Sequence, residues 1–247
     1  LLRAELPDWS DARFESYAAR HYPPYWLKVD LARKVSHARL LAEADAAKTK
    51  LATRVATDAF RGVTELTVLA PDHPRLLSII AGACAVAGAN IVDAQIFTTT
   101  DGFALDTIFV SRAFDRDEDE LRRAARIAES IEKALRGDLH VGRTLAARTP
   151  SKRISAAFDV LAEVIIDNTL SNRHTVVEIV GLDRQGLLFD LTTALSKLSL
   201  NIGSAHVQTM GEKAVDVFYV SDLTGAKITS RARQGTIRRQ LLELQIG

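Results

Sequence analysis

The chain contains an internal duplication, and this feature constrains its fold more than any other. Asp72 and Asp183 are 111 residues apart, and so are Asn90 and Asn201. Apolar positions between these markers keep the same spacing, with Leu76 corresponding to Leu187. A repeat of this length predicts two similar folding units in tandem.

Each copy shows the order strand, strand, helix, strand, strand, helix, read from apolar runs and from helical spacing. The leading strand can take the sheet edge beside the first core strand through its hairpin. The expected fold class is α+β, with two ferredoxin-like units, each an antiparallel four-stranded sheet with two helices on one face. The last strand retains Asp106 in one copy and Asp216 in the other, 110 residues apart. In the first copy we expect elements at 51–57, 63–70, 76–87, 91–99, 103–112 and 117–136; in the second, the leading strand at 162–168 and the last helix at about 230–246.

The segments outside the two copies differ from them in residue composition and hydrophobic pattern. Residues 1–50 read as helical, with a first helix starting at Ser10 or Asp11 and ending at Pro23-Pro24, and a second from Asp30 to about 50. Residues 138–160 have a linker composition that includes Thr149-Pro150-Ser151. The expected division is a helical segment at 1–50, units at 51–137 and 161–247, and a linker at 138–160.

Composition argues against several classes of protein. The 32 basic and 31 acidic residues give a net charge of +1, so no overall field favours nucleic acid or a membrane surface. No apolar run approaches the length of a bilayer. The single cysteine, Cys84, lies in an apolar helical run and is expected to be a small buried hydrophobe. We expect a cytoplasmic protein and, because the chain starts at Leu1 rather than methionine, a piece of a longer polypeptide.

The turn after the first core strand of the second copy has the chemistry of an anion or amino-acid site. An apolar run at 176–180 stops at a polar turn, and a helical pattern follows at once. The first N–H groups of a helix lack intrahelical partners and attract an anion. Gly186 leaves the backbone accessible, while Asp183 can cap the helix or bind an ammonium group. Such turns also cap ordinary helices, so a purely structural role stays open.

An Asp at the end of the first core strand and an Asn at the start of the next recur in both copies, and the chain thereby resembles a pair of ACT domains, which are amino-acid-sensing modules. The runs RHYPPYW at 20–26 and DAQIFTTTDG at 93–102 are similar to the C-terminal part of the bifunctional PII uridylyltransferase/uridylyl-removing enzymes. This resemblance implies a glutamine-binding regulatory region in bacterial nitrogen control, with PII as partner of the parent enzyme. It also implies Mg and UTP for that parent. The chain itself has no P-loop, no Cys/His ligand spacing and no His-Asp dipeptide, so we assign it no catalytic residue, metal ligand or cofactor.

The resemblance also implies ligand-binding residues at the turn and at the start of the next core strand. Arg75 replaces the family glycine in the first unit and Gln185 replaces a proline in the second, so the second turn is favoured as the glutamine pocket. Such sites often lie across an interface between ACT units, which pair within one chain or between chains. The implied residues are Asp183, Arg184, Gln185, Gly186, Leu187 and Leu188 with Asn201 and Ile202, and Asp72, His73, Pro74, Arg75, Leu76 and Leu77 with Asn90 and Ile91.

Other functional classes remain as alternatives. A ligand-free ACT module for dimerisation or docking, or a stand-alone amino-acid sensor, fits the same sequence. An RNA-recognition fold has a related layout, and Gly102-Phe103-Ala104 echoes part of its signature. Asp101 and Asp106 nevertheless stand where that signature needs a basic and an apolar residue. Nucleic acid is therefore not an expected partner.

Overall fold

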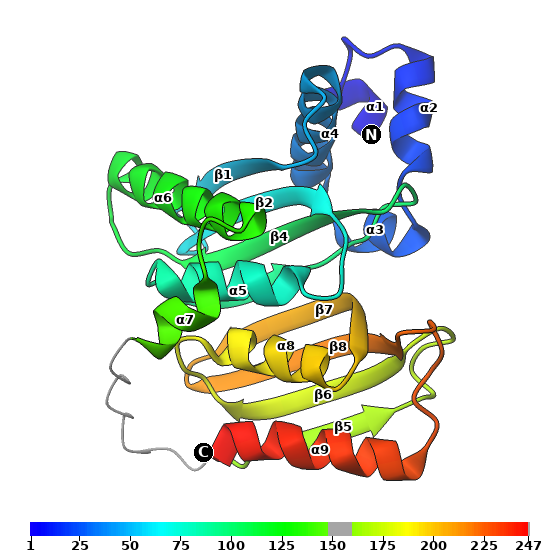
Figure 1. The fold of residues 1–247 in the computed structure, drawn as a ribbon. Coiled ribbons are helices and arrows are strands. Elements are labelled where there is room, and N and C mark those ends of the chain that lie inside the picture. Colours follow the sequence, from blue (N-terminus) through cyan, green and yellow to red (C-terminus); the bar gives the residue numbers. More distant parts are fainter. Residues whose placement is uncertain (148–159, 247) are drawn as a thin grey trace.

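The strands of both copies form one continuous antiparallel sheet. The computed structural model describes residues 1–147 and 160–246 and contains an 8-stranded sheet in the order β1-β2-β4-β3-β7-β8-β6-β5 (Figure 1). The units meet where β3 pairs with β7. The strands are β1 (Ala52–Asp58), β2 (Val63–Pro71), β3 (Ile91–Gln95), β4 (Phe103–Ser111), β5 (Glu163–Asp167), β6 (Thr175–Leu182), β7 (Leu200–Met210) and β8 (Lys213–Asp222).

Each leading strand occupies the predicted edge position, because β1 pairs with β2 and β5 with β6. Side chains alternate between the faces of a sheet. The apolar residues of one face, including Leu66 and Ile108, pack against the four helices that belong to the two units and form the main core with them. Figure 1 shows these helices on a common face of the sheet. The expected α+β class with two ferredoxin-like units is confirmed. The helices are α5 (Leu76–Val86), α6 (Asp117–Arg136), α8 (Leu187–Lys197) and α9 (Arg231–Ile246).

Residues 1–47 form four helices on the other face of the first unit. Ser10 caps α2 by accepting from the N–H of Arg13, and Asp30 caps α4 in the same way. Their buried side chains form a second core with Leu69 and Leu105 of the sheet. These helices are α1 (Leu2–Glu5), α2 (Asp11–Ala19), α3 (Pro23–Lys28) and α4 (Leu31–Ala47).

Three local expectations need correction. The first long helix ends at Ala19, and Pro23 instead starts α3, where its fixed φ suits a first helical turn. Strand β3 ends at Gln95 rather than 99, because the chain turns toward the N-terminal helices and Phe97 packs edge-on against Tyr25. The predicted linker begins with helix α7 (Val141–Ala146). The remainder of that linker, 148–159 with Thr149-Pro150-Ser151, lies outside the described residues.

The expectation for Cys84 is confirmed. Its side chain is fully buried in α5, and burial raises the pKa of the thiol to about 12. Within the described part of the chain, no helix combines the length and hydropathy needed to span a bilayer.

Candidate functional site

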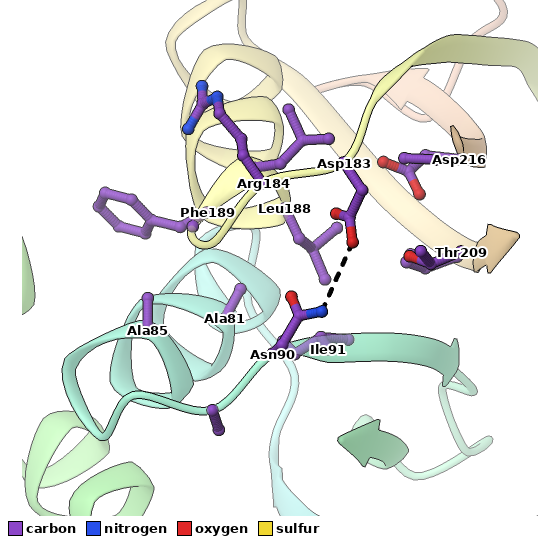
Figure 2. A pocket seen from close by; sticks show the side chains of 15 residues that line it. Ala81, Ala85, Asn90, Ile91, Asp183, Arg184, Leu188, Phe189, Thr209 and Asp216 are labelled. Atoms are coloured by element: carbon purple, nitrogen blue, oxygen red, sulfur yellow. Dashed lines mark hydrogen bonds between the residues drawn. The ribbon is translucent and has the colours of Figure 1, made fainter. Parts of the chain in front are cut away.

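A narrow pocket lies between the two units at the N-terminus of α8 (Figure 2). Its cavity volume is about 20 Å³, which is room for about one water molecule. The second unit supplies the turn before α8, the start of that helix and the inner face of β7 and β8. The first unit supplies the end of α5 and the start of β3. The lining residues are Asp183, Arg184, Gly186, Leu187, Leu188, Phe189, Val207, Thr209, Ala214 and Asp216 with Ala81, Ala85, Ala89, Asn90 and Ile91.

Two contacts between the units bring these walls together. Pairing of β3 with β7, which sets Ala94 opposite Val207, brings the start of β3 close to the second unit's turn. Helix α5 packs on α8, and this close approach depends on small residues of α5. A Cβ at Gly82 would lie 2.7 Å from the ring of Phe189. Gly82 therefore leaves room for the ring of Phe189 against α5.

The turn before α8 presents the helix N-terminus to the pocket. Gly186 is the N-cap residue with φ of 83°, a conformation that favours glycine, and no side chain caps the helix. Asp183 therefore does not cap α8. Its backbone N–H donates to the carbonyl of Glu212 at 2.8 Å, which anchors the turn, and its carboxylate faces Asn90. The N–H of Leu187 donates to the carbonyl of Arg184 at 3.0 Å. The next N–H groups of a helix also lack intrahelical partners, and with a carboxylate nearby they create an anion site and a cation site within one pocket.

Asn90 and Asp183 form a polar contact across the interface. The amide Nδ2 of Asn90 donates to Oδ2 of Asp183 at 3.5 Å, the upper limit for a hydrogen bond. Figure 2 shows this contact beside the turn that precedes α8. Arg184 is turned away to Asp190, with 2.6 Å between the guanidinium and the carboxylate. A ligand ammonium group can therefore reach Asp183 without displacing a strong partner.

Asp216 is the most deeply buried polar side chain among the residues that line the pocket. It lies on β8, and its cross-strand neighbours are Ile179 and Val207. Its exposed fraction is 1%, and its Oδ1 has no hydrogen-bond partner among the described residues. Burial, followed by the nearby charge of Asp183, raises the pKa of Asp216 to about 7.

The sequence interpretation did not include Asp216 in the site. A signal was present, because Asp106 and Asp216 are carboxylates at corresponding positions of two apolar strands. Asp106 is likewise 1% exposed, and burial followed by the charge of Asp72 raises its pKa well above the usual value. An acid repeated in an apolar strand indicates a constrained position. Phe189, Val207, Thr209 and the four alanines of the lining offered no comparable signal, because tertiary packing alone brings them to the pocket.

The structure brings together seven of the predicted site residues. Asn90 and Ile91 of the first unit lie beside the turn of the second, so the pocket combines the predicted turn of one unit with the predicted strand start of the other. Gln185 is exposed outside the pocket, and its Nε2 donates to the carbonyl of Ala85 at 3.4 Å. The seven residues are Asp183, Arg184, Gly186, Leu187, Leu188, Asn90 and Ile91.

The other predicted residues lie apart from this pocket. Asn201 and Ile202 are at the start of β7 and pair with Ser221 and Val220 of β8. The first turn, residues 72–75, is exposed, and the carboxylate of Asp72 accepts from Thr98 at 3.0 Å. His73 accepts the backbone N–H of Arg75, while Pro74 precedes it; Leu76 and Leu77 are buried in the first core.

Comparisons with known proteins agree with this architecture. Residues 163–245 match the family model described as an ACR9-like, ACT-like domain. The bifunctional uridylyltransferase/uridylyl-removing enzymes of Nitrobacter hamburgensis and Rhodopseudomonas palustris are 59% and 60% identical to the chain, over 242 and 244 residues. Each alignment covers 98% of this chain and 26% of the relative. The chain thus spans about a quarter of the length of the curated relatives it matches, and the resemblance found in the sequence is confirmed for that region.

A solved structure of aspartate kinase from Synechocystis also matches. The match covers 75% of this chain and 27% of the kinase chain, with 15% sequence identity and a TM-score of 0.42. This score is too low to support a conclusion about the fold or the site.

Proposed function

We propose that this chain is the glutamine-binding regulatory region of a bifunctional uridylyltransferase/uridylyl-removing enzyme that modifies the PII signalling protein in nitrogen control. The pocket at the N-terminus of α8 carries the proposal, because its walls come from both units and its polar groups match an amino-acid zwitterion. Similarity to enzymes of that name over 98% of the chain supports the choice of parent.

The polar groups of the pocket suggest how the ligand is oriented. The N–H groups that follow Leu187 in the first turn of α8 bind its carboxylate, with the positive end of the helix dipole adding to the attraction. The carboxylate of Asp183 binds its ammonium group, which replaces the long contact from Asn90. A bond between an ammonium group and a carboxylate, in which both partners are charged, is stronger than a long hydrogen bond from a neutral amide.

The small cavity gives the proposal a regulatory consequence. The pocket has room for about one water molecule, so we expect an amino acid to widen it by moving the start of α8 away from α5 and β3. These walls belong to different units, and the ligand therefore favours a different packing of the two units. A differential affinity for the open packing is what allows a ligand to shift such an equilibrium. A coupling of about 1–3 kcal/mol would suffice to regulate neighbouring catalytic domains that use Mg and UTP.

Calorimetric titration of the chain with L-glutamine tests this function, with L-glutamate and D-glutamine as ligand controls. Asp183→Asn should weaken L-glutamine binding by roughly tenfold to a hundredfold, the usual loss for a charged hydrogen bond. Asp72→Asn is the matched control, because Asp72 holds the corresponding turn position but does not line the pocket.

Two results would contradict the proposal. Absence of both binding heat and thermal shift with the unaltered chain would favour a module for docking or dimerisation. Equal losses in the Asp183→Asn and Asp72→Asn variants would reject this pocket as the binding site.

A further inference from the structure

Asp216 combines a position at the pocket with an unsatisfied polar atom. Its side chain points to the helix side of the sheet and lies in Figure 2 on the strand side of the pocket, near Thr209 and Asp183. The exposed fraction is 1%, and Oδ1 has no hydrogen-bond partner among the described residues. An unpaired buried polar atom costs stability. A partner that enters with a ligand would remove this cost.

The surroundings of Asp216 contain little charge. Ile179 and Val207, its cross-strand neighbours on β6 and β7, are apolar. On the first unit's side, Asn90, Ile91 and three alanines line the pocket and carry no charge.

Two charged groups face the pocket from the turn before α8, and neither neutralises Asp216. Arg184 is engaged by Asp190, and Asp183 is a like charge. Burial and the charge of Asp183 hold the pKa of Asp216 at about 7, so the carboxyl is largely uncharged below that pH.

We propose that Asp216 recognises the side-chain amide of the bound amino acid and thereby discriminates glutamine from glutamate, an inference that rests on the proposed function. An uncharged carboxyl has one O–H donor and one carbonyl acceptor. A primary amide has an acceptor oxygen and N–H donors. The two groups can therefore form a pair of hydrogen bonds, with the carboxyl O–H donating to the amide oxygen and an amide N–H donating to the carboxyl.

A glutamate side chain cannot form the same pair. Its carboxylate has no N–H donor and would bring a further negative charge beside Asp183 and Asp216. Like charges at such a site disfavour each other unless a proton is taken up. Pockets that hydrogen-bond a polar substrate group reject analogues lacking it far more strongly than apolar pockets do.

Titration calorimetry of two Asp216 variants with L-glutamine and L-glutamate tests the inference. Asp216→Leu removes both hydrogen bonds and should weaken L-glutamine binding about tenfold or more. Asp216→Asn keeps a donor and an acceptor but removes the titratable proton and the negative charge. Its N–H groups can bind either side chain, so the affinity ratio of glutamine to glutamate should fall about tenfold or more.

Asp106 supplies the matched control. It is equally buried at the corresponding position of the first unit, and its Oδ1 also lacks a partner among the described residues, but it does not line the pocket. Asp106→Asn and Asp106→Leu should leave the ratio unchanged. Thermal melting of each variant shows whether it is folded, and Asp216→Asn carries the test if Asp216→Leu does not fold.

The outcomes separate this inference from the proposed function. If the unaltered chain binds L-glutamine and the Asp216→Asn variant keeps the same ratio, Asp216 is not the discriminating residue and the binding function stands. An equal change in the Asp106→Asn variant would also overturn the inference. Failure of the unaltered chain to bind L-glutamine would overturn both.

Discussion

The buried carboxyl of Asp216 makes the stability of this protein depend on pH, and Asp216→Asn should remove that dependence. The pKa of this group rises from 3.8 to about 7 on folding, chiefly through burial. Between these values the native state holds a proton that the unfolded state has lost. The free energy of unfolding therefore falls as the pH rises, by about 1.4 kcal/mol per pH unit for one group. The contribution is lost progressively between about pH 4 and pH 7 and changes little above that.

The full effect is about 4 kcal/mol, from a shift of about three pKa units at about 1.4 kcal/mol each. Asparagine has nearly the same shape and does not titrate, so the variant should lack this term. Urea unfolding followed by circular dichroism, from pH 4.5 to pH 8, gives the free energy for both proteins. Their difference isolates Asp216, because all other titrating groups are shared. The variant should become more stable than the unaltered protein as the pH rises.

Parallel pH profiles for the two proteins would refute this reasoning. They would mean that Asp216 is ionised in the native state, with water or a cation that offsets its burial. A difference of the opposite sign would mean that the carboxylate is stabilised on folding. Asp106→Asn should give a profile of the same direction, because burial also raises the pKa of Asp106 well above its usual value.

Four further predictions follow from particular contacts. L-glutamine affinity should fall by up to about tenfold per pH unit above about pH 7, as Asp216 loses its proton, and calorimetry of Asp216→Asn should show no such fall. His37 is buried between Tyr25 and Thr107, and burial is the main cause that lowers its pKa to about 3. The free energy of unfolding should therefore fall as the pH falls from about 6.5 toward 3. In urea unfolding, His37→Gln should show a weaker pH dependence over this range. Gly82→Ala should lower the free energy of unfolding by about 1–3 kcal/mol, because its Cβ would lie 2.2 Å from Cγ1 of Val141. Gly142→Ala is the control and should cost nothing, because no atom lies within 4 Å of its Cβ position. Equal melting temperatures for the two variants would contradict the packing argument. Gly186→Val should cost about 1–2 kcal/mol through the positive φ of 83° and should abolish glutamine binding while the fold persists; unchanged calorimetric affinity would contradict the pocket assignment.

Local signals in the sequence determined much of this protein. The duplication predicted two units, and apolar periodicity predicted the order of strands and helices in each. Ser10 and Asp30 located two helix starts. In each case the side-chain oxygen accepts from the N–H three residues later, so the interaction is local in the sequence. The turn at Asp183 and Gly186 was found from the polar residues between an apolar run and a helical pattern. These features depend on neighbours within a few residues, and the sequence displays them directly.

The tertiary structure decided how the units meet. Pairing of β3 with β7 joins residues more than a hundred positions apart, and either strand could have presented that edge to another partner. This pairing places Asn90 beside the turn of the other unit, so the pocket joins the turn of the second copy to the strand start of the first. It also decided that Asp216, one of two repeated acids, lines the pocket between the units while Asp106 does not line it. Long-range strand pairing depends on complementary surfaces and edges, and no local periodicity encodes it.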